Sequence, residues 1–140
     1  MARVPTIFQT CTPRPEVLAG ELPDAIFAAD LWDVVCRKPG THPDYLDPVR
    51  FIAGTHPTEN LKLLVKEVTE RLAGVGGGTP VFRLETGFGG GKTHSLIACV
   101  HAAREGERLA AHLTDFRITK FPAPDTVKVA AFVGEESDPL

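Results

Sequence analysis

One short run of glycines constrains the fold of this chain more than any other feature. Residues 87–91 contain four glycines and lead directly into Lys92 and Thr93. A β-prone run, residues 81–86, precedes them, and apolar spacing predicts a helix over residues 92–104. Glycines allow a tight curl with positive φ angles, so backbone N–H groups can surround a multiply charged anion. The order strand, glycine loop, Gly-Lys-Thr and helix predicts a phosphate-binding loop.

Each residue type in this loop suits one part of a bound nucleotide. Lys92 is expected to neutralise the β- and γ-phosphates and so to be the catalytic residue, and the Thr93 hydroxyl is expected to hold the metal ion. The N–H groups of the first helical turn add partial positive charge. The predicted cofactors are therefore ATP and Mg²⁺. The predicted nucleotide-binding residues are Gly87, Phe88, Gly89, Gly90, Gly91, Lys92, Thr93 and His94.

The role of His94 has two readings. It follows Thr93 directly and could touch a phosphate or a metal-bound water, or it could be a first-turn residue whose ring points elsewhere. The loop also departs from the usual pattern, because Thr86 stands where that pattern has its first glycine. A dinucleotide-binding loop is disfavoured, since Lys92 stands where a third glycine is needed.

The acid that ATP hydrolysis requires is not evident in the sequence. Such a carboxylate normally follows a buried apolar strand, where it helps to hold Mg²⁺. Residues 127–133 are apolar and of strand length, but Gly134, Glu135 and Glu136 follow them. We interpret this run as an intermediate strand, with Glu135 as the less favoured acidic candidate. Only two strands are visible, so the chain is expected to be the N-terminal piece of a longer protein and to be inactive alone.

These elements predict an α/β fold, namely the start of a P-loop NTPase parallel sheet after a mostly helical N-terminal region. Residues 1–76 form the helical region in this prediction, and residues 77–140 form an incomplete P-loop NTPase domain. Helices are expected over residues 24–36 and 57–73. The second helix has an apolar stripe typical of core packing, made of Leu61, Leu64, Val65, Val68 and Leu72.

Composition excludes several other classes of protein. The chain is 43% hydrophobic and 24% charged with a net charge of −3, which indicates a soluble globular domain without a basic nucleic-acid footprint. Its three cysteines are irregularly spaced, against a disulfide framework or zinc ribbon. His101 and His112 complete no metal-ligand spacing. Without a signal peptide or a membrane-length apolar run, the expected location is the cytoplasm.

The chain resembles a family of large prokaryotic P-loop ATPases related to AAA+ proteins, often encoded beside DNA methyltransferases in phage-defence clusters. The resemblance rests on PRPEVL at residues 13–18, IFAADL at 26–31, YLDP at 45–48 with Phe51, THPT at 55–58 with Leu61 and Lys62, Arg71 and Leu72, and LETGFGGGKTH at 84–94. In that family Thr86 is the normal entry residue. The resemblance implies an ATPase that couples ATP hydrolysis to work on a partner, with DNA or a methyltransferase engaged through regions outside this chain. An oligomer is also an open possibility.

Two other functions stay open at the level of sequence. One is a nucleotide-gated switch or scaffold that binds ATP with negligible hydrolysis. The other is an interaction module without a nucleotide, in which the helix over residues 57–73 is the contact surface.

Overall fold

The computed structural model describes residues 5–13, 15–20, 29–75, 77, 80–85, 87 and 89–132, with the side chains of Phe8 and Glu16 excepted. These residues are helical or irregular in structure. The helices are α1 (Ile7–Thr10), α2 (Pro15–Ala19), α3 (Leu31–Cys36), α4 (Pro43–Leu46), α5 (Pro48–Ala53), α6 (Glu59–Leu72) and α7 (Lys92–Glu105), followed by the 3₁₀ helices η2 (Gly106–His112) and η3 (Thr114–Phe116).

The predicted α/β fold is wrong, because no strand forms within the described part of the chain. Residues 81–85 and 127–132 are extended, and in each segment more buried and more exposed residues alternate. Alternation and β-branched side chains favour an extended backbone, but a strand also requires a neighbouring chain to share its hydrogen bonds. Apolar side chains of both segments also remain in contact with solvent, since Val81 is 72% exposed and Phe132 is 91% exposed.

Side-chain caps explain where several helices begin. Asp30 accepts hydrogen bonds from the N–H groups of Trp32 and Asp33, at 2.7 and 3.2 Å, and so starts α3 at Leu31. This places the start of α3 later than the predicted residue 24, although residues 21–28 lie outside the described part. Asp47 caps α5 in the same way, and Pro48 follows it at the first helical position.

The long helix α6 is confirmed as a helix, but it begins two residues later than predicted. Thr58 is its N-cap, and the Thr58 hydroxyl accepts a hydrogen bond from Leu61 N–H at 3.4 Å. Leu61 and Val65 of the predicted stripe are buried, whereas Leu72 at the end of the helix is 44% exposed.

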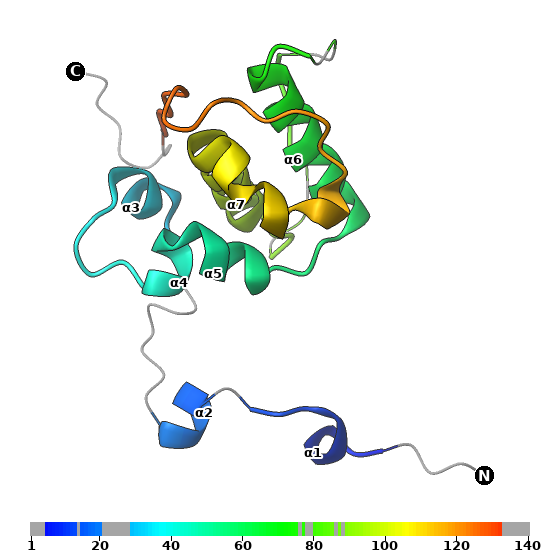
Figure 1. Cartoon of the computed structure of the whole chain (residues 1–140). Helices are drawn as coiled ribbons and strands as arrows, with labels where there is room; N and C mark the ends of the chain where they lie inside the picture. Colours follow the sequence, from blue (N-terminus) through cyan, green and yellow to red (C-terminus); the bar gives the residue numbers. More distant parts are fainter. Residues whose placement is uncertain are drawn as a thin grey trace.

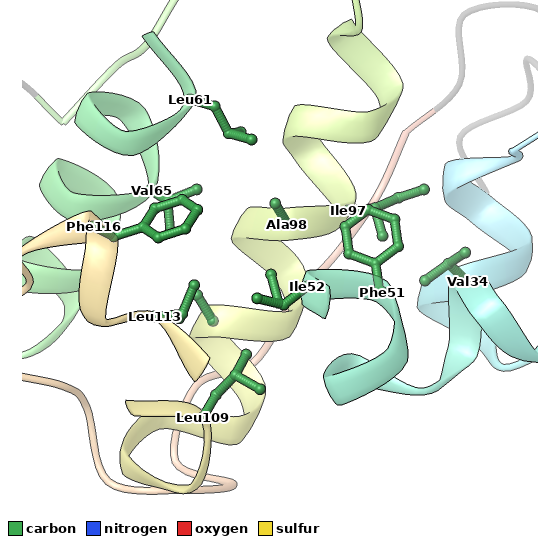
Figure 2. Packing of buried hydrophobic residues seen from close by; sticks show 11 residues of the cluster. Val34, Phe51, Ile52, Leu61, Val65, Ile97, Ala98, Leu109, Leu113 and Phe116 are labelled. Carbon is green, nitrogen blue, oxygen red and sulfur yellow. The ribbon is translucent and has the colours of Figure 1, made fainter. Parts of the chain in front are cut away.

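Helix α7 lies at the centre of the fold and packs against α3, α5, α6 and η2 (Figure 1). Ile97 and Ala98 of α7 are completely buried and meet side chains from the surrounding helices (Figure 2). Burial of one such isoleucine stabilises the fold by about 1.5–3 kcal/mol. The core cluster consists of Val34, Phe51, Ile52, Leu61, Val65, Ile97, Ala98, Ala102, Leu109, Leu113 and Phe116.

The N-terminal helices differ from this core. Every residue of the segment 5–20 whose burial is described is exposed, and α1 and α2 lie apart from the other helices (Figure 1). Among the described residues, no helix combines the length and the hydropathy that a membrane span requires.

Candidate phosphate loop

The glycine loop makes a tight turn before α7. Gly90 N–H donates to Gly87 O at 3.2 Å, which closes the turn. Gly89 and Gly91 have φ angles of +76° and +75°, in the left-handed region that other residues rarely adopt. Gly87, Gly89, Gly90 and Gly91 are all exposed. The sequence-based prediction of a tightly curled glycine turn is therefore confirmed for the described residues of the loop.

No side chain in the described part of the chain caps the N-terminus of α7. Its N-cap is Gly91, and the first turn contains no acidic residue. By contrast, Asp30, Asp47 and Thr58 cap α3, α5 and α6 through their side chains. The first N–H groups of any α-helix have no acceptor inside the helix, so they can bind an external anion.

Lys92 and Thr93 are the first two residues of α7. Lys92 is exposed, and its Nζ donates to Gly87 O at 3.1 Å, so the ammonium group folds back over the loop. Thr93 is half-buried. A Cβ atom added at Gly87, Gly89 or Gly91 would meet no atom within 4 Å. The loop therefore has open space beside its backbone, together with one cationic side chain.

His94 points away from the loop and into the protein. Its Nε2 lies 2.9 Å from Thr55 Oγ1, and its ring packs on the ring of Phe51 with centroids 4.5 Å apart. Burial lowers the pKa of His94 below its ordinary value of 6.5. Of the two readings of His94, the geometry supports the first-turn residue whose ring points elsewhere.

The structure does not describe four of the other candidates from the sequence. Thr86, Phe88, Glu135 and Glu136 lie outside the described residues. The acidic residue that precedes the loop, Glu85, forms an ion pair with Arg83 at 2.6 Å. In the part of the chain that the structure describes, no three His, Cys, Asp or Glu side chains are grouped closely enough to hold a metal ion.

An apolar groove of about 320 Å³ lies between α3, α6, α7 and the extended residues 127–131. Cys99 lines this groove, and burial raises the pKa of its thiol to about 12. A thiol with so high a pKa is a poor nucleophile and a poor metal ligand at neutral pH. Cys11, Cys36 and Cys99 are all free thiols.

Sequence reasoning missed the two residues that hold His94. Thr55 lies 39 residues before His94 in the chain, and the sequence shows it only as part of the THPT motif of the family resemblance. Phe51 was noted only as part of the family resemblance. No local pattern links either residue to the loop, because the contacts arise when α5 packs against α7.

Comparison with known proteins identifies the family of the chain. No curated protein and no solved structure matches it. The family model described as the DUF499 N-terminal domain matches residues 8–119, from α1 through η3 and including the whole glycine loop. Residues 120–132 lie beyond that match. This chain therefore belongs to the DUF499 N-terminal domain family.

Proposed function

We propose that this chain binds the triphosphate of Mg²⁺-ATP at residues 87–93. The observation that carries the proposal is the turn of Gly87–Gly91, with two left-handed glycines, leading into an uncapped helix whose first residue is Lys92. The proposal does not depend on a sheet. It uses the backbone donors of the turn, the N-terminus of α7 and one ammonium group, which together suit a multiply charged anion.

The loop glycines, Lys92 and Thr93 each contact a different part of the nucleotide in this proposal. The backbone of Gly89 and Gly91 offers N–H groups where an added Cβ has no described neighbour within 4 Å, while the N–H of Gly90 holds the turn closed on Gly87 O. Lys92 already folds over the loop through Gly87 O and supplies positive charge to the phosphates. The Thr93 hydroxyl is a hard oxygen ligand that suits Mg²⁺, which takes its remaining ligands from phosphate and water.

The wider role follows from the resemblance to prokaryotic P-loop ATPases. We propose that the site belongs to a larger ATPase, which couples ATP binding and hydrolysis to work on a partner such as DNA. A nucleotide-gated switch would use the same loop, so turnover by the protein separates the two roles. Steady release of phosphate that depends on Lys92 favours the ATPase, and tight binding without turnover favours the switch.

The test is a titration of the protein with Mg²⁺-ATP. Lys92→Ala removes the ammonium group and should weaken binding roughly 10- to 100-fold, the value of one or two charge-assisted hydrogen bonds. Thr93→Ala should weaken binding in the presence of Mg²⁺ and have little effect in its absence. Lys120→Ala, an exposed lysine outside the loop, is the control and should bind as the wild type does. Equal affinity of Lys92→Ala and wild type would overturn the proposal.

A further inference from the structure

His94 forms a connection between the phosphate loop and α5. It lies in the first turn of α7, two residues after Lys92, and its side chain leaves that turn on the side of α5. There its ring stacks on Phe51 with an angle of 31° between the ring planes, and its Nε2 reaches the hydroxyl of Thr55. Thr55 follows the end of α5 and is buried.

The direction of this hydrogen bond follows from the partners of Thr55. The Thr55 hydroxyl donates to Phe51 O at 2.6 Å, one turn earlier in the chain. A threonine hydroxyl has only one hydrogen, so it must accept the hydrogen bond from His94. The Nε2 atom of His94 therefore carries a hydrogen and donates it to Thr55 Oγ1.

A second histidine makes the same kind of contact two turns further along α7. His101 Nε2 lies 2.9 Å from the carbonyl oxygen of Tyr45, to which it must donate, and its ring centroid is 5.2 Å from that of Phe51. Residues seven apart lie on the same face of a helix. The two imidazoles therefore both contact Phe51 and hold α4 and α5 against α7. Only His94 lies in the turn that carries Lys92 and Thr93.

We propose, on the basis of the nucleotide site proposed above, that His94 is a positioning residue for that site. Its hydrogen bond to Thr55 fixes the first turn of α7, and so fixes the direction in which Lys92 and Thr93 project. The ring of His94 itself is directed to Thr55 and Phe51 in this arrangement. A helical turn is stiff, so an anchor on one residue constrains its neighbours. Binding groups that are displaced by about 1 Å lose much of their contribution.

The chain offers matched substitutions for this hydrogen bond. His94→Phe keeps an aromatic ring on Phe51 and removes the donor. It leaves the Thr55 hydroxyl with its own acceptor, Phe51 O, so the fold should be retained. His94→Gln replaces the ring with an amide N–H at a similar reach. Thr55→Val removes the acceptor with little change of shape, and Thr55→Ser retains it. His101→Phe is the control, because it removes the equivalent donor away from the loop.

The experiment measures the Kd for Mg²⁺-ATP and the free energy of unfolding without nucleotide for each variant. His94→Phe and Thr55→Val should each raise Kd roughly tenfold, the value of one hydrogen bond, and the double variant should raise it no further. His94→Gln and Thr55→Ser should bind within about twofold of the wild type, as should His101→Phe. Near-wild-type affinity in His94→Gln and Thr55→Ser would support the hydrogen bond, because packing on Phe51 alone would not restore the affinity in these variants.

Three results would overturn this inference while leaving the proposed nucleotide site in place. Wild-type affinity in His94→Phe, with binding lost in Lys92→Ala, would leave the nucleotide site intact and remove His94 from it. Equal losses of ATP affinity in His94→Phe and His101→Phe would show that both histidines contribute only to the packing of α7. If His94→Phe does not fold, the Thr55 variants provide the test. Equal affinities of Thr55→Val and Thr55→Ser for Mg²⁺-ATP would then overturn the inference. Unchanged binding in Lys92→Ala would instead remove the proposed function and this inference together.

Discussion

A glycine lies at each end of α7, but the two glycines have opposite surroundings. At the N-terminal end, Gly91 has a φ of +75°, yet a Cβ atom there would meet no atom within 4 Å. At the C-terminal end, Gly106 has a φ of +52° and a ψ of −126°, and a Cβ atom would overlap the carbonyl oxygen of Pro122. The backbone of the same chain fills the space at Gly106. At Gly91 the space is open.

The surroundings of the two ends agree with this difference. Beyond Gly106 the chain returns along the end of α7, where Asp125 N–H donates to Arg104 O at 3.0 Å and Arg108 pairs with Asp125 at 2.9 Å. Around Gly91 the loop is exposed, and no side chain caps the helix. One end of α7 is thus closed by the chain itself, whereas no described segment closes the other end. Three predictions test this contrast.

The largest effect is expected at the closed end. Gly106→Ala forces a methyl group against the backbone of Pro122 and requires a backbone conformation that is costly for alanine. We expect the free energy of unfolding to fall by about 3 kcal/mol or more, measured by urea denaturation. Gly74→Ala is the matched control, because Gly74 has a φ of +77° and open space around its Cβ position. Equal losses in the two variants would show that contact with Pro122 has no energetic consequence.

At the open end, a substitution should reduce stability less than at the closed end and should reduce ATP binding more. In Gly91→Ala the positive φ should cost about 1–2 kcal/mol of stability, since no contact adds to it. The affinity for Mg²⁺-ATP should fall roughly tenfold or more, because a methyl group then stands beside the loop backbone. Folded Gly106→Ala protein should keep wild-type affinity. If Gly91→Ala binds ATP normally, the open space at this end is not a phosphate site.

The smallest effect is expected for His94 and His101, which lie on one face of α7. Burial lowers the pKa of His94 and of His101 below 6.5, so the folded chain resists protonation at both rings. As the pH falls below 6.5 the unfolded chain takes up protons that the folded chain does not, and stability falls. Above about pH 7.5 these histidines add no pH dependence.

Urea denaturation at pH 7.5, 6.5 and 5.5 measures this slope, and His101→Gln should reduce it. The Glu70 carboxylate does not contribute in this range. Hydrogen bonds from Thr119 lower its pKa, so its stabilising effect is complete above pH 4.5 and is lost only below that value. A stability that does not change between pH 7.5 and 5.5 would contradict burial of the two neutral rings.

Local patterns predicted several helices well. The helix expected over residues 92–104 is present as Lys92–Glu105, and the helix expected over residues 57–73 is present as Glu59–Leu72. Their spacing of apolar residues and their flanking glycines depend on near neighbours in the chain. The first residue of α6 was misplaced because Thr55, Pro57 and Thr58 all suit a helix start, and only Thr58 accepts the capping hydrogen bond.

The sheet was predicted wrongly for a non-local reason. Residues 81–85 and 127–132 have the composition of strands and are extended, but a ladder depends on which backbone lies alongside, and that is a tertiary property. In the described chain the 127–131 segment instead borders an apolar groove against α3, α6 and α7. The role of His94 was left open for the same reason, since its partner Thr55 is 39 residues away.

Residues within a few positions of one another fix the glycine turn, the position of Lys92 and Thr93 at the start of a helix, and the apolar faces of α6 and α7. Packing of distant segments fixes the rest: residues 81–85 and 127–132 form no strand in the described chain, His94 turns to α5, and the space beside Gly106 is filled while no described residue fills that beside Gly91. The physical reason is that hydrogen-bond partners and excluded volume come from segments far apart in the chain, which meet only when the core around α7 packs.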